Sequence, residues 1–285
     1  MSLHHHRFIN ATLFALLLMG SHQVQADSER IISLAPNLTE FVYALGAGSD
    51  LVGVIAHSDY PLQAQHKPVI GDYQHLDIEK ILALKPTVIL SWAAGNPPQQ
   101  LATLRQFHIP IVDVSPQHIA QLPEITKKIG RAISREQQAH KLAQQEQAQL
   151  DNFAKNYAGK TKVRVFYQIW HHPFITISKK SWLNDALTLC GASNVFADAA
   201  TAYPQVNLEQ ILSTRPQAIL LSSNNPQGAK IWQQWHTPAK HHLIQLNPDW
   251  MSRFGPRLVK GIGQLCQQLN ALRASEKIAH SQNGF

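Results

Sequence analysis

The chain has 285 residues, of which 44% are hydrophobic and 15% are charged, and its formal net charge is +7 at pH 7. This length suits one or two domains, and the composition excludes an intrinsically disordered chain. The 25 Lys and Arg residues are scattered along the sequence, so we expect a solvated basic surface and no nucleic acid partner. Two cysteines exclude both a disulfide-dense scaffold and a four-thiolate zinc site.

The N-terminal segment predicts export. Basic and histidine residues precede an apolar run from Phe8 to Met19, and small side chains follow up to Ala26. This order is typical of a cleaved signal peptide, here residues 1–26. The apolar run is too short to cross a hydrocarbon core of about 30 Å as an anchor. No cysteine follows it to carry a lipid, so we expect a soluble protein held in the bacterial periplasm.

Short strands alternate with helices along the rest of the chain. A β-branched run at 30–34 leads into a helix that Asn37 or Thr39 can cap and that Gly46 ends. Further strands are expected at 51–55, 88–92 and 109–114, and then at 163–169, 174–177, 218–221 and 243–246. This alternation predicts an α/β protein with mainly parallel sheets.

One unit of this pattern occurs twice. Residues 73–90 align without a gap with residues 203–220, and each copy predicts a short helix, a proline that stops it and a buried strand. Chance similarity between two ordinary units is the alternative. We interpret the repeat as two similar α/β lobes, at 27–118 and 161–275. The matching pairs include Tyr73 and Tyr203, Glu79 and Glu209, and Pro86 and Pro216.

A helical segment is predicted between the lobes, at 119–160. Residues 135–157 contain neither Gly nor Pro and are rich in Gln, Ala and Glu, which is typical of a solvent-exposed helix joining two domains. Ser134 and Gln137 are spaced for a capping box at its start. Such a helix spans on the order of 30 Å, so we expect a rigid bridge that fixes the spacing of the lobes. Residues 276–285 are expected to form a flexible tail.

The two cysteines fall in the second lobe. Cys190 follows a predicted helix at 182–189, and Cys266 lies in a predicted terminal helix at 257–272. In an oxidising compartment such a pair is more often bridged than free, and two buried thiols are the alternative.

Sequence motifs of common enzyme classes are absent, among them G-x-S-x-G, H-E-x-x-H and the phosphate-binding loop. The 16 histidines raise the alternative of a secreted metal-dependent enzyme. However, His171-His172 and His241-His242 are adjacent pairs, whose side chains would point to opposite faces of a strand. We therefore expect a non-enzymatic protein without a metal or cofactor.

Aromatic side chains follow strand ends in both halves of the chain. Tyr60 and Trp92 lie in the first lobe, and Tyr203 and Trp250 lie in the second. Because α/β sheets bind ligands beyond the carboxyl ends of their strands, these loops predict a cleft between the lobes. The alternative is that each ring only closes the rim of a core.

These segments together resemble the iron-siderophore and vitamin B12 class of periplasmic solute-binding proteins, which serve ABC importers. Residues 31–40, 52–54 and 81–86 match the class pattern, whereas 58–61, 91–96 and 249–253 resemble its B12 branch. The resemblance extends from about Arg30 to Leu272.

The resemblance implies two rigid lobes joined by one helix, and a monomer that captures cobalamin or a related corrinoid in its cleft. The corrinoid would be the transported ligand rather than a cofactor. It would be delivered to an inner-membrane ABC permease dimer with its ATPase subunits. A haem or ferric-siderophore carrier is the alternative within the same class.

The resemblance also implies roles for individual residues. Glu79 and Glu209 match surface carboxylates that dock on the permease, and Cys190 and Cys266 match the disulfide of the class. The positions matching ligand contacts are His57, Tyr73, Trp92, Ile175, Tyr203, Asp249, Trp250, Met251, Ser252 and Arg253.

Some of these positions depart from the pattern of the class. His57 replaces a tyrosine, Tyr73 and Tyr203 replace tryptophans, and Ile175 replaces a phenylalanine. We therefore expect a less aromatic cleft that could admit cobinamide or another corrinoid. A neutral His57 imidazole could ligate cobalt, but stacking or hydrogen bonding needs less exact geometry and is favoured.

Overall fold

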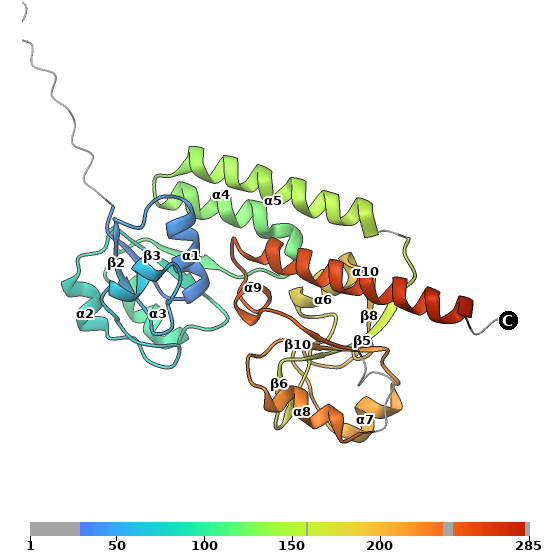
Figure 1. The fold of residues 1–285 in the computed structure, drawn as a ribbon. Coiled ribbons are helices and arrows are strands. Elements are labelled where there is room, and N and C mark those ends of the chain that lie inside the picture. The colour runs from blue at the N-terminus through green and yellow to red at the C-terminus, as the bar shows by residue number, and fades with distance from the viewer. Residues whose placement is uncertain (1–28, 158, 236–241, 283–285) are drawn as a thin grey trace, which may run out of the picture.

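The computed structural model describes residues 29–157, 159–235 and 242–282. The predicted signal peptide, residues 1–26, lies outside these ranges. The described chain forms two α/β lobes beneath a layer of long helices (Figure 1). None of the helices in these ranges has the length and apolar character needed to cross a membrane.

The first lobe contains a four-stranded parallel sheet in the order β2-β1-β3-β4. Both faces of this sheet are buried, which is why its strands consist almost entirely of apolar residues. Ile31 and Leu90 pack into the core on one side, and Ile32 and Ile89 pack on the other. The elements are β1 (Ile31–Ser33), α1 (Pro36–Ala44), β2 (Leu51–Val54), α2 (Ile78–Ala83), β3 (Val88–Trp92), α3 (Pro98–Arg105) and β4 (Ile111–Val114).

The second lobe contains a parallel sheet in the order β11-β10-β5-β8 and a small antiparallel sheet in the order β6-β7-β9. The strand expected at 174–177 therefore joins the small sheet and not the main one, because His172 and Pro173 form the turn of a hairpin. The elements are β5 (Val163–Gln168), β6 (Trp170–His171), β7 (Phe174–Ile175), α6 (Trp182–Leu189), β8 (Ala192–Asn194), β9 (Gln205–Val206), α7 (Leu208–Ser213), β10 (Ala218–Leu221), α8 (Gln227–Gln233) and β11 (Leu243–Gln245).

The sequence repeat corresponds to a repeated local structure. Asp77 caps α2 by accepting a hydrogen bond from the third residue of the helix, and Asn207 caps α7 in the same way. Lys85 and Arg215 end the two helices with φ angles of 47° and 48°. Strands β3 and β10 follow, each in the interior of its sheet. The prediction of two similar helix–turn–strand units is confirmed.

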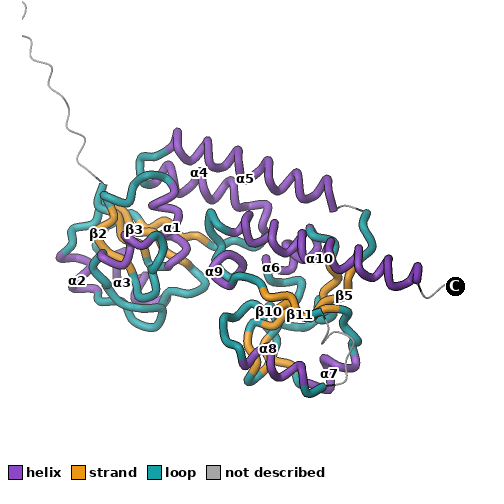
Figure 2. Tube along the Cα trace, viewed as in Figure 1, coloured by secondary structure: helices purple, strands orange, loops and turns teal. Residues whose placement is uncertain are grey.

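The lobes are joined by two packed helices rather than by one exposed helix. After the short 3-10 turn η2 (Ile119–Gln121), α4 (Leu122–Ala132) lies alongside α5 (Glu136–Tyr157) (Figures 1 and 2). A Cβ atom on Gly130 would lie 2.1 Å from the Cβ atom of Ala139, so the close approach of these helices requires glycine there. The long helix is therefore found where it was predicted, but one face of it is buried.

Three expectations about helix ends are wrong. Helix α1 begins at Pro36 without a side-chain cap, so Asn37 and Thr39 lie inside the helix and neither caps it. Ser134 adopts a φ of 55°, and its hydroxyl donates to Glu29 Oε1 at 2.9 Å, so it does not form the expected capping box with Gln137. The terminal helix α10 (Leu258–Gln282) continues through the described part of the expected flexible tail.

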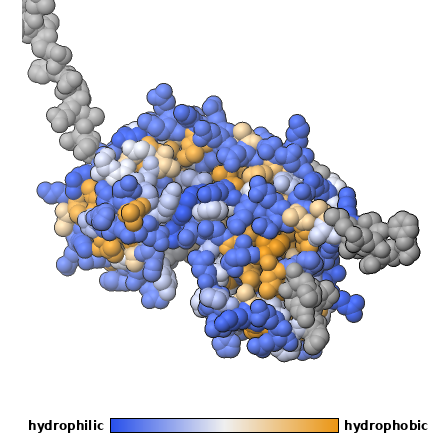
Figure 3. Space-filling model, in the orientation of Figure 1, coloured by the Kyte–Doolittle hydropathy of each residue, from blue (hydrophilic) through white to orange (hydrophobic). Residues whose placement is uncertain are grey.

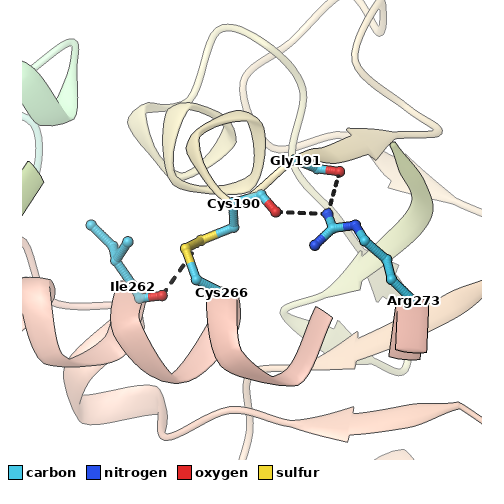
Figure 4. The surroundings of a disulfide bond; sticks show 5 residues. All are labelled: Cys190, Gly191, Ile262, Cys266 and Arg273. Atoms are coloured by element: carbon cyan, nitrogen blue, oxygen red, sulfur yellow. Dashed lines mark hydrogen bonds between the residues drawn. A yellow bond between two sulfur atoms is a disulfide. The ribbon is translucent and has the colours of Figure 1, made fainter. Parts of the chain in front are cut away.

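Cys190 and Cys266 form the expected disulfide, which ties the end of α6 to α10 (Figure 4). The neighbouring Arg273 donates from Nη2 to the carbonyl oxygens of Cys190 and Gly191, each at 2.8 Å. The bond closes a loop with a sequence separation of 76. In the chain-entropy account, a loop of this length stabilises the fold by about 4 kcal/mol. The disulfide therefore anchors the terminal helix to the second lobe.

Glu146 on α5 is a buried carboxyl group that faces α4. It is 1% exposed, and its Oε1 has no hydrogen-bond partner. The Thr126 Oγ1 atom lies 2.7 Å from Glu146 Oε2 and 3.0 Å from Leu122 O, and its single proton cannot serve both acceptors. A protonated Glu146 resolves this conflict by donating to Thr126. Consistent with that arrangement, burial raises the pKa of Glu146 to about 8.

We predict that Glu146 makes the free energy of unfolding depend on pH. Because its pKa is raised in the folded protein, its favourable contribution is complete below the unfolded pKa, about 4.3. That contribution is lost as the pH rises towards 8. The Glu146→Gln variant can donate to Thr126 at every pH, so its stability relative to the unchanged protein should increase over this range by on the order of 5 kcal/mol.

Denaturant unfolding of both proteins at several pH values between 4.5 and 9 measures this difference. Glu124→Gln, at an exposed position on the same helix pair, is the matched control. A stability difference between Glu146→Gln and the unchanged protein that stays constant with pH would contradict the prediction.

Candidate ligand-binding cleft

A cavity of about 480 Å³ lies between the lobes. Leu34, Ile55 and Trp92 reach it from the carboxyl ends of β1, β2 and β3. Because parallel strands end at one edge of their sheet, these three side chains converge. Ile175 and Tyr203 reach it from the small antiparallel sheet and the loop before β9. The surface of the molecule is hollowed between the two lobes (Figure 3).

Aromatic rings from both lobes meet in the cleft. The ring of Phe254 lies 6.4 Å from that of Trp92 in the first lobe and 5.2 Å from that of Trp182 in the second, the latter pair edge to face. Such contacts add about 0.5–1.5 kcal/mol to simple burial. The three rings form an apolar lining that crosses the boundary between the lobes, and we call them the aromatic floor.

Hydrogen bonds hold this floor in place. The Asn96 Nδ2 atom donates to Leu34 O at 2.7 Å, and the Trp92 backbone N–H donates to Asn96 Oδ1 at 2.7 Å. Asn37 on α1 donates to the carbonyl oxygen of Phe254 at 3.0 Å, a bond between the lobes. These amide side chains are buried and committed to the protein. They therefore fix the rings and are poorly placed to recognise a ligand.

Tyr73 and Tyr203 stand at the rims of the cleft. They come from equivalent loops of the sequence repeat and are 64% and 51% exposed. The Ser181 hydroxyl lies 3.4 Å from the Tyr203 hydroxyl, and Gln74 donates to the Tyr73 hydroxyl at 3.1 Å. Each lobe therefore presents one phenol ring to the opening.

Arg253 alone, among the described residues that line the cavity, carries a charged group. Its Nη1 donates to Asp59 at 2.8 Å and to Glu40 at 3.1 Å, and its Nη2 lies 3.3 Å from Asp249 Oδ1. Burial lowers the pKa of Arg253, but the hydrogen bonds to Asp59 and Glu40 outweigh burial and raise it above the usual value. The surrounding carboxylates offset the positive charge, so the cleft is close to neutral.

The structure brings six of the ten expected ligand positions together in this cavity. They are Tyr73, Trp92, Ile175, Tyr203, Ser252 and Arg253. Trp182 and Phe254 also line it, although they were not among the expected contacts. Phe254 directly follows the expected segment 249–253 in sequence, whereas Trp182 was interpreted only as the start of a helix.

The other four expected positions do not line the cavity. His57, with a φ of 65°, borders a smaller cavity of about 150 Å³ nearby. Asp249 pairs with Arg253, and the ring of Trp250 lies 3.9 Å from Lys260 Nζ. The Met251 side chain is fully buried against Gly261, so it belongs to the core.

Glu79 and Glu209 lie outside the cavity. Each is exposed and occupies the second position of its helix, α2 or α7. Within the described ranges, no group of three His, Cys, Asp or Glu side chains is arranged to hold a metal ion.

Residues 31–252 match the family model described as periplasmic binding protein. The vitamin B12-binding protein of Vibrio cholerae is 36% identical over 246 residues, which cover 85% of this chain and 89% of that protein.

Solved structures give a consistent result. The crystal structure of the periplasmic vitamin B12 binding protein BtuF of Vibrio cholerae matches with a TM-score of 0.80 and 36% identity, covering 86% of this chain and 98% of that one. The periplasmic heme-binding protein RhuT from Roseiflexus sp. RS-1 matches with a TM-score of 0.74 and 23% identity, covering 85% and 97%. The second likeness shows a shared fold alone. With its two lobes, its cleft and this match over most of its length, the chain belongs to the periplasmic binding protein family.

Proposed function

We propose that this protein is the periplasmic solute-binding component of an ABC importer, and that it carries vitamin B12 or a related corrinoid. The observation that carries this proposal is the aromatic, nearly neutral cleft between the lobes. The relatives with 36% identity, which are named for vitamin B12 binding, support it. In this role the protein binds and releases its ligand without altering it, and it needs no cofactor.

The chemistry of the cleft suits a corrinoid. A corrin ring offers flat apolar faces and an edge of neutral amide groups. Apolar faces can pack on the aromatic floor, and the amide edge can accept hydrogen bonds from the phenols of Tyr73 and Tyr203. Arg253 has five N–H groups, and some remain beyond those that pair with Glu40, Asp59 and Asp249, so it can donate to an amide oxygen. A cleft formed before binding lowers the entropic cost of association.

A haem carrier is the second candidate. Tyrosine can ligate haem iron, and Tyr73 and Tyr203 are exposed at the cleft rims. However, haem carries two propionates, and the charge of Arg253 is already offset by three carboxylates. The same argument disfavours an anionic ferric siderophore. The electrostatics of the cleft therefore favour the corrinoid.

We predict that the purified protein binds cyanocobalamin and cobinamide more tightly than haem or an anionic ferric siderophore. Isothermal titration with each compound measures the affinities, and visible absorption spectra report any change in metal ligation. Tight haem binding without corrinoid binding would overturn the proposal in favour of the second candidate.

Variants of the cleft aromatics should separate packing from metal ligation. Replacing Trp92 with alanine removes part of the aromatic floor, so the affinity for cyanocobalamin should fall about 30-fold, as for a central contact residue. Tyr73→Phe and Tyr203→Phe keep the rings and remove one solvent-exposed hydrogen bond each, so this affinity should fall only about three-fold. Phe107→Ala, an exposed aromatic position outside the cavity, is the control. Loss of binding in the Tyr→Phe variants alone would indicate a phenolate ligand and contradict the corrinoid model.

We further propose that Glu79 and Glu209 dock on the permease. They are exposed at equivalent positions of the two lobes, so they would present a roughly symmetric pair of carboxylates to a dimeric partner. Their alternative role is to interact favourably with the amino-terminal ends of α2 and α7.

The double variant Glu79→Lys with Glu209→Lys should abolish stimulation of transport in vesicles carrying the cognate permease, while leaving corrinoid affinity unchanged. Glu124→Lys, on α4, is the control for a charge reversal on the surface. Unimpaired transport would exclude the docking role, and weaker corrinoid binding would show that these residues shape the cleft.

A further inference from the structure

A cluster of charged side chains joins the two lobes beside the cleft. Glu40 lies on α1, and Asp59 follows β2, both in the first lobe. Arg253 follows α9 (Pro248–Met251), and Arg257 precedes α10. We call these four residues the interlobe clasp. Figure 1 places α9 and the start of α10 between α1 and the strands of the second lobe.

Glu40 is the centre of the clasp. Its side chain is 2% exposed, and it accepts three hydrogen bonds from the other lobe. Arg257 donates from Nε to Oε2 at 2.8 Å and from Nη2 to Oε1 at 2.6 Å, and Arg253 donates to Oε1 at 3.1 Å. The two bonds from Arg257 form a planar bidentate pair, which restricts direction as well as distance.

Neighbouring contacts strengthen this connection. The Arg257 guanidinium lies 3.8 Å from the centre of the Tyr60 ring, which belongs to the first lobe. The hydrogen bond that Asn37 donates to Phe254 O also crosses the boundary between the lobes. Asn37 and Glu40 are three residues apart on α1, so they face the same segment of the second lobe.

The clasp and the cleft share residues. Arg253 belongs to both, and Phe254, the next residue, contacts Trp92 and Trp182 in the aromatic floor. A shift of one lobe would therefore separate Glu40 from its arginines and would also part the rings of the floor. Buried ion pairs add little net stability compared with apolar packing, but their strict geometry can specify one arrangement.

We propose that Glu40 is a positioning residue that sets the spacing of the lobes, and through it the shape of the binding cleft. It acts through Arg253 and Arg257 without contacting the ligand. The effect on ligand affinity rests on the corrinoid function proposed above, whereas the effect on lobe spacing does not. The covalent connection through α4 and α5 then keeps the lobes close, and the clasp selects one arrangement.

The spacing of the lobes can be measured directly. Nitroxide labels on Gln99→Cys in α3 and Gln233→Cys in α8, both exposed, report one distance across the cleft by pulsed electron paramagnetic resonance. We expect a narrow distribution in the otherwise unchanged protein and a broader or shifted one in Glu40→Gln. Glu124→Gln removes an ion pair within α4 and should leave the distribution unchanged. Identical distributions for Glu40→Gln and the control would overturn the proposal.

Two Arg257 variants change the same contact but keep Glu40. They therefore test the proposal even if Glu40→Gln does not fold. Arg257→Gln leaves Glu40 paired with Arg253, and Arg257→Lys keeps the charge but loses the bidentate geometry. We expect a broad distribution for Arg257→Gln and an intermediate one for Arg257→Lys. Adding Glu40→Gln to Arg257→Gln should broaden it less than Glu40→Gln does alone, since both remove the same contact. Independent, additive effects would contradict the clasp.

Titration with cyanocobalamin tests whether the spacing of the lobes affects ligand affinity. Glu40→Gln should lower the affinity at least about tenfold, because the ligand must then also order the lobes. A broadened distance distribution with unchanged affinity would overturn the positioning role. If the unchanged protein itself does not bind cyanocobalamin, the proposed function fails, while the distance measurements still decide whether the clasp sets the spacing.

Discussion

The cleft depends on the parallel strands of the first lobe, which all end at one edge of their sheet. Residues that follow β1, β2 and β3 are therefore brought to a single edge of the first lobe. The second lobe contributes its small antiparallel sheet and the segment around Arg253. Two connections bring these surfaces together, the packed pair of α4 and α5 and the buried carboxylate of Glu40. Without a fixed relation between the lobes, neither surface alone would enclose a ligand.

Charge compensation gives this cleft its chemical character. A lone arginine in an apolar cavity would attract anions, but Arg253 is surrounded by Glu40, Asp59 and Asp249. Glu40 and Asp59 reach Arg253 from the first lobe, so ion pairs that cross between the lobes also help to make the cavity nearly neutral. A carrier of anionic ligands needs an uncompensated positive group in its cleft. Here the ion pairs between the lobes offset the charge of Arg253, so they also reduce the attraction of the cleft for anions.

The aromatic content of the cleft is arranged differently from the expectation. His57 lies beside a separate small cavity, and Ile175 presents an aliphatic side chain. Trp182 and Phe254 extend the ring system begun by Trp92 and carry it into the second lobe. The expectation of a less aromatic cleft follows from counting substitutions at assumed positions. The structure adds two rings, Trp182 and Phe254, at positions that the expected set did not contain.

Local patterns in the sequence determined much of this protein. The alternating strands and helices, the repeated helix–turn–strand unit and the long helix can all be recognised in the sequence, because each depends on neighbouring residues. Tertiary structure alone decided that α5 packs on α4, that Trp182 faces the cleft and that Met251 does not. It also decided that Glu40 meets Arg257, 217 residues later in the chain. Such contacts depend on how whole lobes pack, and no short stretch of sequence contains that information.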